Sequence, residues 1–457
     1  MWAISNKQGF NVGRGRCRRL AAWMMLVPMM WASVCLPAAT SAAQAGLAES
    51  APAPISLSSL LHEAMRANPA IAEARLRWQA AQARIPQATG LPAPRIGVEF
   101  EEIPRGTFKV NQAAIMYQLI QSLPFPGKLS LRRRVAVAEG QVAAMRYQQS
   151  VWEILSDLKS AYYEWFLIDQ EQRIQEEQVR WLQQAAASAQ ARYATGSAPH
   201  AELLRAQAEA LEGSNQLTVL EHQRRMTEAH LNHLLSQPVH HAIGSPEPIA
   251  LEPVAFSPDE LWLMASESQP DLLALKFTVE RAEASWRLAK RELLPDLETM
   301  LELRDPAMGP IGPWDLSLAL VLPFWFWTKQ HYGVHAALFD KASTEAAYQA
   351  MQNEIARRIH EHWHGMAAAY TTAVRYRDGL LPLSRQAVVE ELAAYQGGRR
   401  AFADVLEALR ALAEQQRRYA EQLTQVEQHT VLLEQAVGRP LRAEHAVDTT
   451  QDSGSSS

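Results

Sequence analysis

Two stretches that decide the fold match each other at several positions: RYATGSAPHAELLRAQ at 192–207 and AYQGGRRAFADVLEALR at 394–410. The matching pairs, each 202 residues apart, are Tyr193 and Tyr395, Gly196 and Gly398, Glu202 and Asp404, and Leu204 and Leu406. Prolines keep nearly the same offset elsewhere: Pro69 with Pro270, Pro92 with Pro295, and Pro124 with Pro323. Because self-similarity at a fixed spacing marks a repeated unit, we expect two tandem halves, at 46–253 and 254–441.

Each half contains one very long helix. Residues 128–193 hold one glycine and no proline. Apolar residues recur there every three or four positions: Trp152, Leu155, Leu158, Tyr162 and Trp165. This spacing predicts a single helix, which at about 1.5 Å per residue is roughly 100 Å long. Residues 329–395 predict a helix of similar length in the second half, bent near its far end by Gly379 and Pro382.

Shorter helices flank the long ones. Residues 59–88 and 201–236 predict two helices whose summed length matches the long helix, so they can stack end to end beside it. Ser257 and Glu260 form a capping box around Pro258, which is suited to the first position of a helix. This signal marks the start of the second half.

Four short segments alternate apolar and polar residues with the period of a β-strand. Their apolar sets are Ile96, Val98 and Phe100; Ile115, Tyr117 and Leu119; Leu297, Thr299, Leu301 and Leu303; and Leu316, Leu318, Leu320 and Leu322. An apolar side toward lipid and a polar side toward a wet lumen is typical of a membrane barrel, although a soluble sandwich strand has the same period. We favour the barrel, because strand pairs separated by helices of roughly 100 Å do not fit a sandwich.

One chain has too few strands to close such a barrel, because the smallest known barrels have about eight. Copies of the chain must therefore associate. Two copies give eight strands, whose interior is filled by side chains, whereas three give twelve and leave room for a lumen. A trimer is the better conduit.

The first 45 residues predict a signal peptide. Four arginines between Arg14 and Arg19 precede an apolar stretch at 20–36, and small residues at 43–45 suit cleavage after Ala45. Both cysteines of the chain, Cys17 and Cys35, lie in this leader, where Cys35 could also accept a lipid. After it no apolar run reaches 18 residues, so a span of the bilayer would need strands. The polar segment 442–457 predicts a disordered tail, and a net charge of −5 argues against nucleic-acid binding.

The tandem duplication, strand pairs and long helices ending in YxxG, an acidic residue and leucine together resemble the outer-membrane factor family, the TolC-like efflux proteins of Gram-negative tripartite pumps. The likeness covers about 56–441, and the segments 90–101 and 121–139 look most like its heavy-metal efflux branch. The resemblance implies a membrane β-barrel joined to a long α-helical barrel, built by a homotrimer in the outer membrane and reaching into the periplasm. Its expected partners are outer-membrane lipid, a periplasmic membrane-fusion adaptor and an inner-membrane pump, of the RND type. No cofactor and no catalysis are expected.

The resemblance also implies a gate at the two distal turns, 193–200 and 395–402. It assigns the constriction to Tyr395, Arg400 and Glu202, rings of acid to Asp404 and Glu407, and adaptor contact to Tyr193, Gly196, Gly397 and Gly398. Three copies of two acids one helical turn apart would attract cations by their summed potential. Acidic residues also favour the first turn of any helix, so a solvated helix start remains an alternative.

One motif points to different chemistry. His360, Glu361 and His364 match HExxH, which on a helix places two histidines on one face for zinc and the glutamate as general base. With His362 they could instead hold metal loosely inside a duct, or form a solvated face. The motif lies midway along a long helix, and the first half has no counterpart at 157–161, so we predict no protease. A periplasmic coiled-coil adaptor without a pore is the other alternative, which the strands disfavour.

Overall fold

The computed structural model describes residues 54–101, 114–253, 255–304, 313–442 and 445. The predicted signal peptide at 1–45 lies outside the described residues, as does most of the predicted tail at 442–457. The described residues all belong to one compact unit that begins at Ala51.

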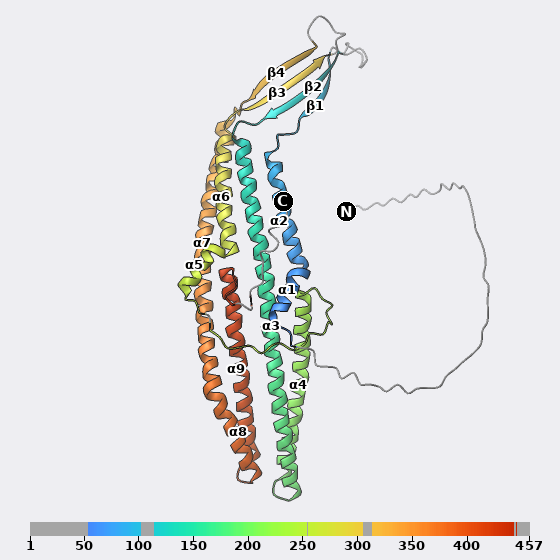
Figure 1. Cartoon of the computed structure of the whole chain (residues 1–457), viewed down its shortest axis with the longest axis vertical. Coiled ribbons are helices and arrows are strands. Elements are labelled where there is room, and N and C mark those ends of the chain that lie inside the picture. The colour runs from blue at the N-terminus through green and yellow to red at the C-terminus, as the bar shows by residue number, and fades with distance from the viewer. Residues whose placement is uncertain (1–53, 102–113, 254, 305–312, 443–444, 446–457) are drawn as a thin grey trace, which may run out of the picture. The chain divides into compact units, whose positions relative to one another are not determined.

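The order of elements occurs twice along the chain (Figure 1). The first half contains α1 (Leu57–Ala67), α2 (Pro69–Thr89), β1 (Arg95–Glu101), β2 (Ala114–Leu123), α3 (Lys128–Ala194) and α4 (His200–Leu234). The second contains α5 (Pro258–Ser268), α6 (Pro270–Arg291), β3 (Asp296–Arg304), β4 (Trp314–Val321), η3 (Phe326–Gln330), α7 (His331–Arg375), η4 (Tyr376–Leu380), α8 (Leu381–Gln396) and α9 (Phe402–Val437). The sequence predicted this order, but not the division of the flanking helices.

Both long helices are present. Helix α3 runs for 67 residues without interruption. Its counterpart continues from η3 through α7 and η4 to the end of α8. The segment η4 is a π-helical turn that contains Gly379 and ends just before Pro382. Proline has no N–H to donate, and this wider turn replaces the break that it would otherwise cause.

The helix predicted at 59–88 is two helices, so that prediction is wrong in detail. Asn68 ends α1, and its side-chain oxygen accepts from the N–H of Ala70 at 2.9 Å to cap α2, whose first residue is Pro69. Its side-chain nitrogen donates to the carbonyl of Leu234 at 2.9 Å and ties this corner to the end of α4. The predicted stacking is confirmed, because α2 and α4 pack on successive lengths of α3 (Figure 1).

The four strands form one antiparallel sheet in the order β1-β2-β3-β4. Val98 pairs with Tyr117, which pairs with Leu303, and Leu301 pairs with Leu316. Because alternate residues of a strand share a face, this register places all four predicted apolar sets on one face, apart from Leu322, which follows β4. That face is open, with exposed fractions such as 81% for Ile96 and 67% for Leu318.

The other face of the sheet, the polar face, holds the charged side chains of the strands together with Met116, Ile120 and Met300. The Gln118 amide donates to Glu302 at 3.2 Å and also to Glu99, and Arg95 pairs with Glu298 at 3.2 Å. The outer edges of β1 and β4 pair with no other strand among the described residues. The sheet therefore has an apolar face, a polar face and two open edges.

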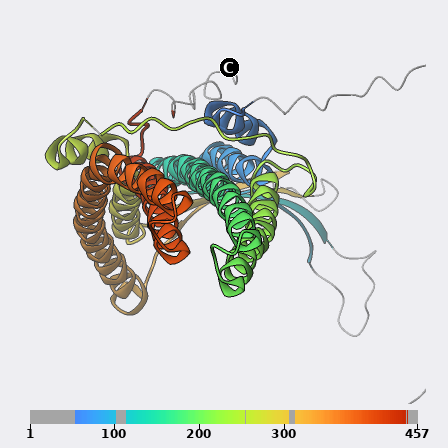
Figure 2. The ribbon, with the colours of Figure 1, turned by 90° about the horizontal axis from the view of Figure 1, so that it is seen from below.

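The apolar core lies between the helices. Seen from below, α7, α9, α3 and α4 stand side by side in a curved row (Figure 2), and each neighbouring pair in this row is in contact. The row ends at α7 and α8 on one side and at α4 on the other. No helix in the described ranges is both long enough and apolar enough to cross a membrane.

Candidate functional site

The two distal turns have the same backbone. Gly196 and Gly398 adopt φ values of 70° and 71°, a left-handed conformation that glycine reaches without strain. In each turn the residue after this glycine donates its N–H to a carbonyl five positions earlier: Ser197 to Arg192 (2.8 Å) and Arg399 to Ala394 (2.9 Å). These bonds end the long helices in the Schellman manner. The motif that revealed the duplication is therefore a helix stop used twice.

Tyr395 joins the two turns. It is fully buried at the end of α8, and its hydroxyl donates to Oε1 of Glu202, in the first turn of α4, at 2.7 Å. Burial, together with this hydrogen bond, raises the pKa of Tyr395 to about 12. The phenol therefore remains a donor at neutral pH. Two of the predicted gate residues, far apart in the sequence, are in direct contact.

The arginine at this contact is Arg192, which is not among the gate residues predicted from the sequence. Its Nη1 lies 3.5 Å from Oε1 of Glu202 and 3.4 Å from the carbonyl oxygen of Tyr395. Its guanidinium carbon lies 4.6 Å from the centre of the Tyr395 ring, within range of a cation–π interaction. The repeat gave no signal for it, because the counterpart of Arg192 in the second half is Ala394.

Within one chain, Arg400 forms its ion pairs with Glu391 and Asp404 and not with Glu202. Its side chain lies 3.5 Å from Glu391 and 3.8 Å from Asp404. The cause is local, because Arg400 and Asp404 are one helical turn apart at the start of α9. The part that Arg400 plays in the gate stays a prediction.

The two predicted ring acids lie at the start of α9. Asp404 accepts from the N–H of Ala401 at 3.3 Å, as a carboxylate at a helix start does. Glu407, one turn further on, is exposed. A single chain therefore has both acids at its tip, but only several copies could form a ring.

The predicted adaptor-contact residues form the outer surface of the tip. Tyr193 is 44% exposed, and its ring centre lies 4.9 Å from that of His200. A Cβ added at Gly196 or Gly398 would meet no atom within 4 Å. Gly397 lies between Tyr395 and Gly398 with φ −78°. The turn surfaces are thus free in one chain, and contact with an adaptor stays a prediction.

The HExxH histidines do not act as one group. The rings of His360 and His364 lie 6.4 Å apart on an exposed part of α7, whereas His362 faces His429 of α9 at 5.7 Å. Glu361 is engaged by Arg357. In the part of the chain that is described, no three His, Cys, Asp or Glu side chains are grouped as a metal site.

A buried ionic cluster, which was not predicted from the sequence, joins the two halves above the turns. Nζ of Lys159, on α3, donates to Glu434, on α9, at 2.6 Å, and both side chains are almost completely buried. Nδ1 of His445 lies 2.8 Å from the other Glu434 oxygen, and its Nε2 lies 2.8 Å from the hydroxyl of Tyr163. Burial opposes the Glu434 charge, but His445 and Lys159 outweigh it and lower the pKa of Glu434.

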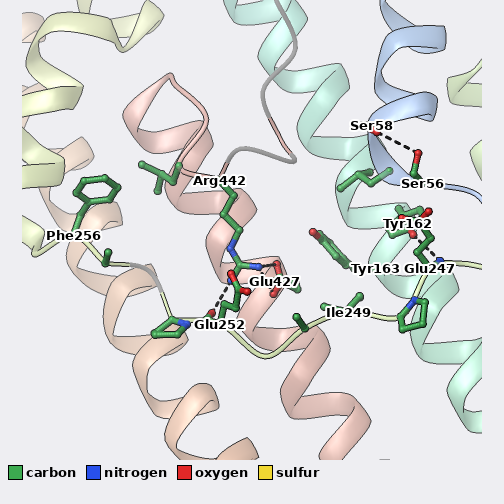
Figure 3. Close-up of a pocket in the computed structure, with 16 residues that line it drawn as sticks. Ser56, Ser58, Tyr162, Tyr163, Glu247, Ile249, Glu252, Phe256, Glu427 and Arg442 are labelled. Atoms are coloured by element: carbon green, nitrogen blue, oxygen red, sulfur yellow. Dashed lines mark hydrogen bonds and ion pairs between the residues drawn. The ribbon is translucent and has the colours of Figure 1, made fainter.

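Beside this cluster lies a cavity of about 540 Å³ (Figure 3). Arg442 reaches into its wall and donates to both carboxylate oxygens of Glu427, at 2.7 and 2.8 Å. Arg442 and His445, at the start of the segment predicted to be disordered, are thus held between the helices. The cluster fixes α3 against α9 and so sets the positions from which the two tips meet.

A sheet with one largely apolar face, above two long helical hairpins whose tips touch, is the architecture of a membrane channel subunit. The chain belongs to the outer membrane efflux protein family, whose model matches residues 60–237 and 262–439. It is therefore an outer-membrane protein of an efflux system, and the fold predicted from the sequence is confirmed.

Solved structures share the fold at low identity. The outer membrane protein VceC of Vibrio cholerae aligns with a TM-score of 0.72 and 17% identity over 84% of this chain and 97% of that one. CusC, a protein whose structures are described with its folding and transmembrane channel formation, aligns with a TM-score of 0.72 and 15% identity over 85% of this chain and 93% of that one. The CmeC outer membrane channel of Campylobacter jejuni aligns with a TM-score of 0.69 and 14% identity over 84% of this chain and 85% of that one. No curated protein matches the sequence.

Proposed function

We propose that three copies of the chain form one passive channel from the periplasm to the exterior. The sheet carries this proposal. Its apolar face is partly to largely exposed and is most exposed on β1 and β4, its other face holds the charged side chains, and its two edges are open. Lipid would cover the first face, water would fill the space beside the second, and β4 of one copy would pair with β1 of the next. Three sheets then close a barrel of twelve strands.

The helices continue this conduit into the periplasm. Their curved row has open ends at α4 and at α7 and α8, so further copies can extend it into a ring (Figure 2). The proposed closure lies at the tips, where Tyr395, Glu202 and Arg192 meet. A periplasmic adaptor that contacts the turns at 193–200 and 395–402 would open it, and an inner-membrane pump would deliver the substrate.

We propose heavy-metal cations as the cargo. The polar face of the sheet supports a cation path, because its acids outnumber its arginines: Glu99, Glu298, Glu302 and Asp315 against Arg95 and Arg304. A lumen lined in this way concentrates cations. A host strain that lacks the protein should become sensitive to heavy-metal salts, and sensitivity to organic compounds alone would point to another cargo.

The sheet assignment has a matched test. Leu318 faces the apolar side, where arginine costs about 2–4 kcal/mol at the bilayer midplane, and its neighbour Ser317 faces the polar side. We expect Leu318→Arg to prevent assembly in the outer membrane and Ser317→Arg to be tolerated. The measurement is the amount of heat-modifiable trimer in outer-membrane fractions and its conductance in planar bilayers. Equal assembly of the two variants would contradict the proposal.

A further inference from the structure

The contact between the two tips has a counterpart that one chain leaves unmade. Tyr395 of the second half donates to Glu202 of the first. The residues 202 positions away, Tyr193 and Asp404, have the same chemistry at the same places in the turns. Tyr193 is 44% exposed, and the Asp404 side chain is 41% exposed. No hydrogen bond joins these two described residues within the chain.

The apolar residues behind the tips show the same difference. On α9, Leu406 and Ala413 are only 4% and 2% exposed, and Leu406 lies in the core shared with the first half. Their counterparts on α4, Leu204 and Leu211, are 53% and 65% exposed. Large exposed side chains at positions that are buried in the other half indicate a surface that another molecule covers.

The partner surface lies at the other end of the row. Trp181 of α3 packs into the core between the halves, where α3 contacts α9. Its counterpart on α8, Leu383, is 66% exposed. Each half therefore has the apolar surface that fits the other, and one chain satisfies only one of the two possible junctions. The molecule that completes the second junction is another copy of the chain.

We infer that each junction between copies is closed by a second latch, in which Tyr193 of one copy donates to Asp404 of its neighbour. This inference rests on the proposed trimer. Within the chain, Arg192 supplies the positive charge beside Glu202, and its counterpart is Ala394. At the second latch Arg400, 3.8 Å from Asp404, supplies it instead. Closed tips are then joined by three latches within chains and three between them.

Cysteine pairs test this latch, because the chain has no cysteine after Cys35. With Tyr193→Cys and Asp404→Cys in one chain, a bismaleimide long enough to replace a tyrosine–carboxylate pair should link protomers into covalent dimers and trimers. Tyr395→Cys with Glu202→Cys should react equally well but leave the mass of the denatured monomer unchanged. Tyr193→Cys with Asp378→Cys should give no link, because Asp378 lies roughly 25 Å from the tip at about 1.5 Å per residue.

The oligomeric state before denaturation separates this inference from the proposed function. A native trimer in which the Tyr193 and Asp404 cysteines do not react, while the pair within the chain does, would overturn the second latch and leave the channel intact. A native protein that is monomeric would contradict the proposed trimer itself. In the wild-type background, Tyr193→Phe should leave the trimer assembled and raise the open fraction of single channels at least severalfold. An unchanged open fraction would also contradict the latch.

Discussion

The hydroxyl of Tyr395 should hold the resting channel closed, and Tyr395→Phe removes that single atom. The ring still fills its buried site, so packing against Phe402 and Arg192 is retained. What is lost is one hydrogen bond of 2.7 Å to the Glu202 carboxylate. Folding and assembly should therefore survive, and only the closed arrangement of the tips should be weakened.

The size of the effect follows from the contact. A hydrogen bond to a charged group contributes about 1.5–3 kcal/mol. After the substitution Glu202 still pairs with Arg192, and its side chain is 17% exposed, so losing the tyrosine hydroxyl leaves the carboxylate only partly unsatisfied. We therefore take the loss of closing free energy as about 1 kcal/mol per copy. Three copies lose about 3 kcal/mol of closing free energy. Since about 1.4 kcal/mol is a factor of ten, the ratio of open to closed channels should rise roughly a hundredfold.

Single-channel recording in planar bilayers measures this ratio directly. Tyr332→Phe is the matched control, because it removes the same hydroxyl from a side chain that is 68% exposed at the start of α7. Arg192→Ala should also favour opening, through the loss of its pairing with Glu202. The sequence-derived variant Tyr395→Phe with Arg400→Ser tests the remaining prediction for Arg400. If Tyr395→Phe assembles as a trimer and gates like the wild type, the closure lies elsewhere.

Three further results are expected. Glu407→Gln should reduce cation preference and block by multivalent cations in the same recordings, with little change in conductance, because it alters the potential and not the aperture. Adding Asp404→Asn should reduce cation preference further and also raise the open fraction, because Asp404 is the acceptor of the inferred second latch. Peptide-cleavage assays with added zinc should show no activity, and an activity abolished by Glu361→Gln would prove that prediction wrong. Burial lowers the pKa of His362 and of His429 in the folded protein. Below pH of about 6.5 the unfolded chain therefore binds more protons than the folded one. The free energy of unfolding should then decrease as the pH falls from about 6.5 through the lowered pKa values. Thermal unfolding should show this loss below pH of about 6.5 and lose part of its pH dependence in His362→Gln with His429→Gln.

Local signals in the sequence predicted most elements. The absence of proline between 128 and 193 predicted α3, and alternation predicted all four strands. The break at Asn68 was missed although its signal was present, because an asparagine before Pro69 can both end one helix and cap the next.

The residues of the candidate site were only partly predictable from the sequence. Tyr395 and Glu202 were selected from the repeat and the family resemblance, and the structure brings them together. Arg192 and the Lys159–Glu434 pair gave no such signal, because neither is part of the duplicated pattern. A buried ion pair between helices in different halves depends on how those helices are rotated about their axes, which no local pattern records.

The sequence by itself determined the periodic features of this protein: the duplication, the long helices, the two-faced strands and the glycine in the turn that ends each long helix. These follow from backbone geometry and from the contrast between apolar and polar side chains along a few turns or one strand. Only the tertiary structure decided which arginine serves Glu202. Arg192 and Arg400 are both close to a turn in sequence, but the packing of α3 against α9 directs Arg192 across the junction, while Arg400 lies beside Glu391 and Asp404.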